Sequence, residues 1–130
     1  MAILNFDLKK YKQAGKFFSQ MYVSQNFKSL DKSFVVKLYV FEIVNRIEMQ
    51  DYDHAEKQLN QLYKLLNDLK ERESITIDLA VTHLIDQFLN TYKNRWRPLK
   101  SDIQAFIKRF QLKPESTGLI NYTQWLSSKI

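Results

Sequence analysis

The chain has 130 residues, enough for one domain with a buried core, and contains two glycines, two prolines and no cysteine. Sandwiches, barrels and doubly wound sheets need turn residues at every connection, so this composition favours long helices. The missing cysteines exclude a disulfide framework, a thiol nucleophile and a cysteine-ligated metal site. The net charge is +6, and residues 93–130 carry all of it, with eight Lys/Arg against two Asp/Glu.

The spacing of apolar residues predicts two helices in the first half of the chain. The first covers about residues 10–24. The second, over 34–49, is apolar nearly all round apart from a thin stripe of Glu42, Asn45 and Arg46. We therefore expect this second helix to be buried between neighbours on two sides.

Two further long helices are predicted at about 52–70 and 75–93. The first has Asp51 as its N-cap and Lys70 near its end, where a cation suits the helix dipole. The second follows Ser74, its expected cap, and has a clean apolar stripe. Its opposite, polar face is formed by Asp78, Thr82, Asp86 and Asn90.

The character of the sequence changes after Asn94. Pro98 stops the preceding helix, and a short amphipathic helix then runs to about Leu112. Residues 113–118 are typical of a loop, and residues 121–128 of a last short helix that contains Trp125. We expect these two short helices to cap the domain.

The sequence also contains a weak internal repeat. At an offset of 41 residues, the segment 7–22 aligns with 48–63, and five of the 16 positions are identical. Tyr11 matches Tyr52, and Ala14 matches Ala55. A small residue at this point lets the preceding helix approach closely, and the aromatic residue covers the turn.

This pattern resembles the tetratricopeptide repeat, in which an aspartate and an aromatic residue open the second helix of each hairpin and a small residue follows. Gln50 and Lys9 stand where the family usually has glycine, and the period of 41 exceeds the family's period of about 34. The chain is similar to the carboxy-terminal portions of some bacterial repeat proteins of unknown function. The residues expected to pack the repeats are Tyr11, Ala14, Phe18, Tyr52, Ala55, Leu59 and Leu62.

The resemblance implies an all-α fold in which antiparallel helical hairpins stack as a short superhelix. Residues 1–130 then form a single domain, with repeat-like hairpins over 1–93 and a basic capping segment over 94–130. In this register the first hairpin lacks most of its first helix. The chain is therefore either a fragment of a longer repeat protein or a domain with a short first helix, and we expect self-association through residues 1–22.

Residues suited to catalysis are sparse. The two histidines, His54 and His83, have no second ligand at metal-binding spacing, and two glycines cannot build a phosphate-binding loop. The carboxylates around Asp51 are explained by the start of a helix, where negative charge is stabilising. We expect no enzyme activity, no metal and no cofactor.

Only one pattern in the sequence stands out as a candidate binding site: residues 92–100, where basic and aromatic residues are interleaved. Alternating cations and rings are typical of single-stranded nucleic-acid binders and also suit an acidic protein partner. The structural alternative buries Trp96 against the preceding helix and leaves the arginines in solvent. The candidate partner-binding residues are Lys93, Arg95, Trp96, Arg97, Lys100, Lys108 and Arg109.

Helical repeat arrays usually present binding surfaces, so the expected function is protein–protein interaction or scaffolding. The alternative is a nucleic-acid-associated accessory domain that uses the basic segment. No secretion signal and no apolar run of about 18 residues is present. We therefore expect a cytoplasmic protein without a membrane partner.

Overall fold

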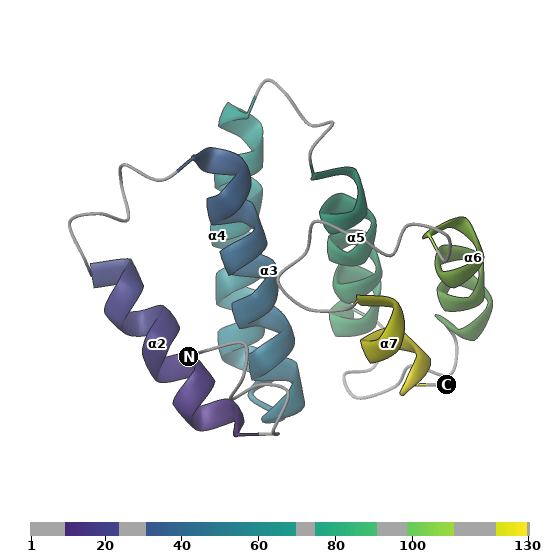
Figure 1. The fold of residues 1–130 in the computed structure, drawn as a ribbon, viewed down its shortest axis with the longest axis horizontal. Coiled ribbons are helices and arrows are strands. Elements are labelled where there is room, and N and C mark those ends of the chain that lie inside the picture. The colour runs from purple at the N-terminus through teal and green to yellow at the C-terminus, as the bar shows by residue number, and fades with distance from the viewer. Residues whose placement is uncertain (1–9, 24–30, 70–74, 91–98, 111–121, 130) are drawn as a thin grey trace.

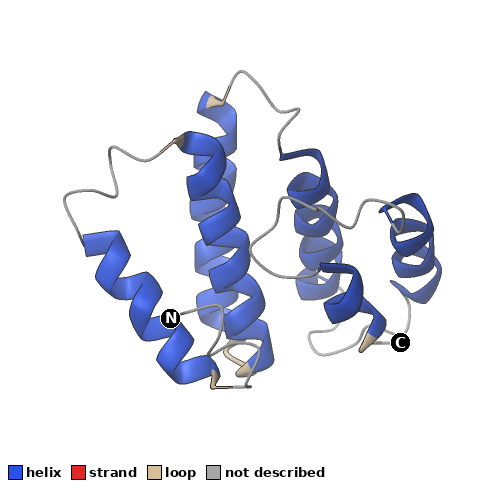
Figure 2. Cartoon of the chain, in the orientation of Figure 1, coloured by secondary structure: helices blue, strands red, loops and turns tan. Residues whose placement is uncertain are grey.

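The computed structural model describes residues 10–23, 31–69, 75–90, 99–110 and 122–129, with the side chains of 17–19 and 21–23 outside this description. The described residues form six helices and no strand, which confirms the all-α class (Figures 1 and 2). None of these helices combines the length and the apolarity needed to cross a membrane. The helices are α2 (Tyr11–Val23), α3 (Lys32–Glu48), α4 (Tyr52–Asp68), α5 (Thr76–Asn90), α6 (Lys100–Phe110) and α7 (Tyr122–Ser127).

Helix α3 is the centre of the fold and contacts α2, α4 and α5 (Figure 1). Twelve of its 17 residues are buried, including most of its β-branched side chains. The expected burial of this segment is therefore confirmed. Two of the three residues of the polar stripe are buried as well, since Glu42 and Asn45 have no exposed surface and α2 covers Asn45, whereas Arg46 is half-buried.

The turn from α3 to α4 is tight and strained. The backbone N–H of Gln50 donates to the carbonyl of Ile47 and that of Asp51 to the carbonyl of Arg46, both at 2.9 Å. This pair of bonds is the Schellman arrangement, which needs a left-handed residue after the helix. Gln50 supplies it with φ of 59°, a conformation that glycine adopts without steric cost. Gln50 therefore occupies a position that suits glycine, as the resemblance implied.

Helix α4 begins as expected and ends slightly earlier. The Asp51 side chain accepts a hydrogen bond from the backbone N–H of His54, so its role as N-cap is confirmed. The last helical residue is Asp68, and Leu69 is the C-cap. Lys70, expected in the last turn, lies outside both the helix and the described residues.

The residues on α4 that were expected to pack the repeats are all at least half-buried. Ala55 and Leu62 have no exposed surface, and Leu59 is also buried. Tyr52 is half-buried and its ring meets that of Phe88 on α5, with centroids 5.9 Å apart. These residues therefore join α4 to its neighbours.

The equivalent positions on α2 are described only in part. Ala14 is fully buried and Tyr11 half-buried, whereas the side chain of Phe18 lies outside the description. The backbone of α2 passes close to α3, since a Cβ added to Gly15 would lie 3.3 Å from the Asn45 side-chain nitrogen. Small residues on α2 therefore permit the close approach.

Helix α5 corrects the expected pattern. Asp78 and Thr82, assigned to its polar face, are buried, with 0% and 3% of their surface exposed. The reason is that α3 and α7 cover this face, and Lys37 and Tyr122 supply polar partners there. Asn90, at the end of the helix, is exposed as expected.

The last helix, α7, closes the domain. It lies between α3 and α6 in Figure 1 and contacts α6. Tyr122, Trp125 and Leu126 are buried. The indole nitrogen of Trp125 donates to Glu48 of α3 at 2.5 Å, and Lys129 forms an ion pair with the same carboxylate. Its apolar and polar contacts therefore hold α7 against the rest of the fold.

Candidate functional site

Helices α5 and α6 enclose an open groove of about 750 Å³. The residues that line it recur at intervals of three or four on each helix, as expected for two helix faces turned toward one space. On α5 they are Thr76, Leu79, Ala80, His83, Leu84 and Gln87. On α6 they are Asp102, Ala105, Phe106, Arg109 and Phe110.

The apolar walls of the groove are continuous with the core. Leu84, Phe106 and Phe110 are each 5% exposed, and the two phenylalanine rings lie 4.8 Å apart between centroids. Ala80 is half-buried and Ala105 exposed, so small side chains leave the space between the helices open. The groove therefore offers an apolar, rigidly supported floor with room above it.

The charged groups of the groove lie mainly on α6. Asp102 stands in the first turn of this helix, and Lys108 and Arg109 in the last, the distribution that the helix dipole favours. Asp102 and Arg109 are seven residues apart, which is two turns or about 10 Å along one face. The guanidinium carbon of Arg109 lies 4.9 Å from the centre of the Phe110 ring. A cation is therefore held beside the apolar floor.

The wall of the groove also contains a buried polar group without a partner among the described residues. The side-chain oxygen of Gln87 is buried and accepts no hydrogen bond from the residues that the structure describes. Leaving such an oxygen unsatisfied costs about 1–3 kcal/mol. A ligand with a hydrogen-bond donor at this level of the groove would remove that penalty.

A polar cluster on the other side of α5 is fully enclosed. Lys37 Nζ lies 2.5 Å from Oδ2 of Asp78, and the Tyr122 hydroxyl donates to Oδ1 at 2.6 Å. The Thr82 hydroxyl donates to the backbone carbonyl of Asp78. Burial, followed by the negative charge of Asp78 and the hydrogen bond to it, raises the pKa of Tyr122. This cluster joins α3, α5 and α7, and none of its members lines the groove.

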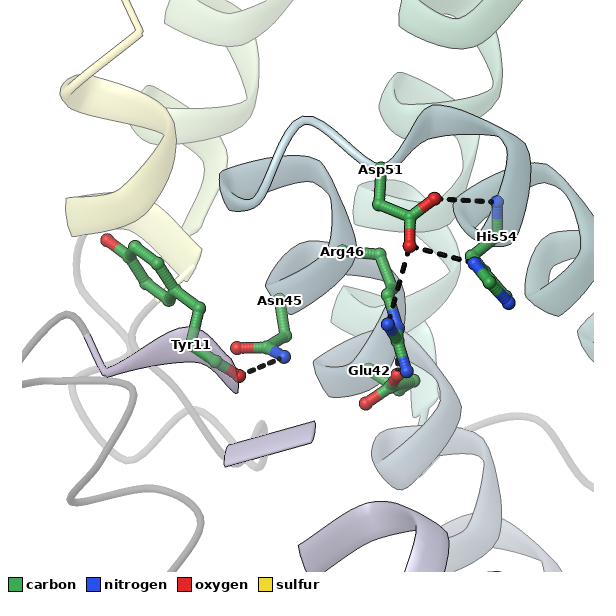
Figure 3. A network of polar contacts seen from close by, with 6 residues as sticks. All are labelled: Tyr11, Glu42, Asn45, Arg46, Asp51 and His54. Atoms are coloured by element: carbon green, nitrogen blue, oxygen red, sulfur yellow. Dashed lines mark hydrogen bonds and ion pairs between the residues drawn. The ribbon is translucent and has the colours of Figure 1, made fainter. Parts of the chain in front are cut away.

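A second polar network links α3 to the start of α4 (Figure 3). Arg46 bonds to Glu42 at 2.6 Å and to Asp51 at 3.4 Å, and Asp51 contacts the His54 ring at 2.8 Å. Burial raises the pKa of Glu42, and Arg46 opposes this shift. Glu42 has no exposed surface. A carboxyl with a raised pKa suits acid–base chemistry, but a substrate cannot reach one that is enclosed in this way.

The same network continues to α2. The side-chain nitrogen of Asn45 donates to the backbone carbonyl of Tyr11 at 2.8 Å (Figure 3). The other side-chain oxygen of Glu42, Oε2, and the Asn45 oxygen are buried without a hydrogen-bond partner among the described residues. The polar stripe of α3 therefore serves as a contact between helices and is not a surface.

The structure describes three of the seven candidate partner-binding residues. Lys100, Lys108 and Arg109 are exposed on α6, and of these only Arg109 lines the groove. The other four lie in 91–98, outside the described residues, so their expected role in partner binding is untested. They are Lys93, Arg95, Trp96 and Arg97.

The sequence reasoning did not find the groove. The available signal was the apolar surface of α5 beyond its main stripe, at Leu79 and Ala80, together with Ala105 on α6. A helix that is apolar on more than one face needs more than one packing partner. On this side, α6 covers α5 only partly.

The remaining ionisable groups form no metal site within the described ranges, since no three histidine or acidic side chains come together there. His54 and His83 are both exposed. Comparison with known protein families, with curated proteins and with solved structures finds no match to this chain.

Proposed function

We propose that this chain is a protein–protein interaction module built from tetratricopeptide-like helical hairpins and that it binds a segment of its partner in the α5–α6 groove. The contacts of α3 with α4, and of α5 with both, are those expected of consecutive stacked hairpins. In this arrangement α6 follows α5 as the next helix of the array. The groove lies between them.

The groove is the observation that carries this proposal. Its volume of about 750 Å³ falls within the usual range for binding sites, about 300–1,000 Å³. It combines apolar walls with a few polar groups on its edges: Gln87, Asp102 and Arg109. Apolar area supplies affinity, and sparse polar groups supply orientation.

The buried ionisable groups support binding over catalysis. Asp78 and Glu42 have no exposed surface and are used in contacts between helices. His83 and Arg109 line the groove from different helices, on surfaces open to solvent. Their arrangement suits the edge of an interface.

Site-specific crosslinking tests the proposal. A photoreactive residue is placed at Ala105, which lines the groove, or at Gln104, its exposed neighbour on the same helix. We expect protein adducts from position 105 in extracts of cells that express the chain, and few from position 104. The captured protein is then purified and its affinity for the chain measured.

A matched pair of variants completes this test. Ala105→Trp fills the groove and should abolish binding of the purified partner, whereas Gln104→Trp should leave its affinity unchanged. Equal crosslinking at the two positions, or full affinity for Ala105→Trp, would contradict the proposed function. Circular dichroism of both variants confirms that the helices are retained.

A further inference from the structure

We infer that the occupant of the α5–α6 groove is an amphipathic helix of a partner protein whose apolar ridge is flanked by acidic side chains on the edge that meets α6. This inference rests on the proposed function and specifies the chemistry of the partner. It is carried by the helical spacing of the lining residues, by the cation beside the apolar floor and by the unsatisfied oxygen of Gln87.

The shape of the groove suits a third helix. Its two walls are helix faces, and ridges of side chains on one helix pack into the grooves of another. Thr76 and Gln87 mark the two ends of the α5 wall, about 16 Å apart at 1.5 Å per residue. Three turns of a partner helix cover this length, with apolar anchors at i, i+3 or i+4, and i+7.

The charge of α6, whose residues Asp102 and Arg109 both line the groove, favours an acidic partner. Helix α6 exposes Lys100, Lys108 and Arg109 and only one acidic residue, Asp102. Arg109 lies over the Phe110 ring, so a carboxylate that approaches it pairs at the edge of an apolar surface. Such pairs are less screened by water than pairs between two fully exposed side chains. The sequence adds long-range attraction, because residues 93–130 carry the whole net charge of +6.

Gln87 adds a requirement at one end of the partner helix. Its buried side-chain oxygen accepts a hydrogen bond, and within the described part of the chain it has no partner. A partner side chain with an N–H or O–H group, placed beside the apolar ridge, satisfies it. The expected motif therefore combines apolar anchors, one donor near an end of the helix and an acidic edge.

The same features favour a protein over a nucleic acid. Proteins that bind single strands stack the bases on accessible aromatic faces. The two aromatic residues of the groove, Phe106 and Phe110, are each 5% exposed and are packed against each other. Neither ring therefore has an open face on which a base could stack.

Designed helical peptides test this inference with the purified chain. One peptide carries the apolar ridge with an asparagine near the end that meets Gln87 and a glutamate edge. A second has a lysine edge, and a third keeps the glutamates but replaces the ridge with serines. Fluorescence anisotropy should show the glutamate peptide binding about tenfold or more tighter than the lysine peptide, with a preference that declines as salt is added. The serine peptide should not bind.

Charge reversal supplies the decisive comparison. Arg109→Glu should reverse the preference so that the lysine peptide binds more tightly. Lys64→Glu, the same change on an exposed residue of α4, should leave the order of affinities unchanged. A reversal in both variants would show that only the net charge matters and would overturn the inference.

The outcomes separate the inference from the proposed function. If both charged peptides bind equally and Ala105→Trp blocks both, the groove binds helices but the acidic preference is wrong. If none of the peptides binds at high micromolar concentration, the proposed function fails as well. Displacement of the bound peptide by a single-stranded oligonucleotide, or crosslinking of Ala105 to a second copy of the chain, would also overturn the inference.

Discussion

Replacing Lys37 with methionine tests the enclosed cluster that joins α3, α5 and α7. Lys37 is 8% exposed, and its ammonium lies 2.5 Å from the carboxylate of Asp78, which is fully buried. Methionine has a similar length and volume, so the change removes the charge and leaves little empty space. The carboxylate then keeps one described side-chain donor, the hydroxyl of Tyr122 at 2.6 Å.

The expected cost follows from what remains around Asp78. Removing one member of a buried ion pair usually costs about 3–5 kcal/mol, because the other charge stays buried without its partner. The hydrogen bond from Tyr122 still stabilises the carboxylate, so we expect the lower end, about 3 kcal/mol. For a domain of this size, such a loss lowers the melting temperature by roughly 10 °C.

Urea denaturation followed by circular dichroism measures this loss. Lys64→Met, the same substitution at an exposed position on α4, is the control and should change the free energy of unfolding by at most about 0.5 kcal/mol. The double variant Lys37→Met/Asp78→Asn removes both charges and keeps an acceptor for Tyr122. It should therefore be at least about 1 kcal/mol more stable than Lys37→Met alone. The reasoning is refuted if Lys37→Met loses less than about 1 kcal/mol, or if the double variant is the less stable of the two.

Three further substitutions test the fold elsewhere. Gln50→Gly should raise the free energy of unfolding by about 0.5–1 kcal/mol, because glycine adopts the φ of 59° without strain; no gain in a thermal melt would argue against the strained turn. Ala55→Leu should lower it by about 1–3 kcal/mol, since this fully buried alanine has no room for a larger side chain; an unchanged melt would remove the repeat assignment. Glu42→Gln should gain stability relative to the wild type as the pH rises. The pKa of Glu42 is raised in the folded protein, above the ordinary value of about 4.3. The folded wild type therefore binds this proton more tightly than the unfolded chain does. The resulting stabilisation is complete below the ordinary value and is lost as the pH rises through the folded pKa. Urea midpoints between pH 4 and pH 7 measure the difference, and a constant difference would contradict the shift.

The sequence predicted the helices well because each one carries a strong local signal. The stripe over 52–70 and the cap at Asp51 are local features, and the structure places α4 within two residues of the expected limits. The near-continuous apolar run of α3 predicted a central helix for the same reason. Apolar periodicity reports which face is buried, independently of which neighbour buries it.

The buried polar groups could not be predicted in this way. Asp78 and Thr82 follow the polar spacing of α5, yet both are buried, because Lys37 and Tyr122 meet Asp78 from distant parts of the chain. These partners are 41 and 44 residues away, and no local pattern connects them. A polar residue can be buried where the fold provides it with a hydrogen-bond or ion-pair partner, so its burial depends on the tertiary arrangement.

The candidate site was predicted only in part. The charge asymmetry pointed to the basic end, and Arg109 does line the groove. The groove itself depends on how far α5 and α6 are separated, and periodicity within a single helix carries no information about that distance. Ala80 and Ala105 leave the space open only because the fold brings both of them to its lining.

The two sides of α5 show why the groove remains open while the opposite side is closed. Toward α3 and α7, the carboxylate of Asp78 is satisfied by Lys37 and Tyr122, and this buried pairing holds the helices together. Toward α6, the Gln87 oxygen has no partner among the described residues, and small side chains leave the space between the helices unfilled. The side of α5 on which the buried polar groups are satisfied therefore stabilises the fold. The other side, which leaves one buried oxygen unsatisfied, is suited to bind a partner.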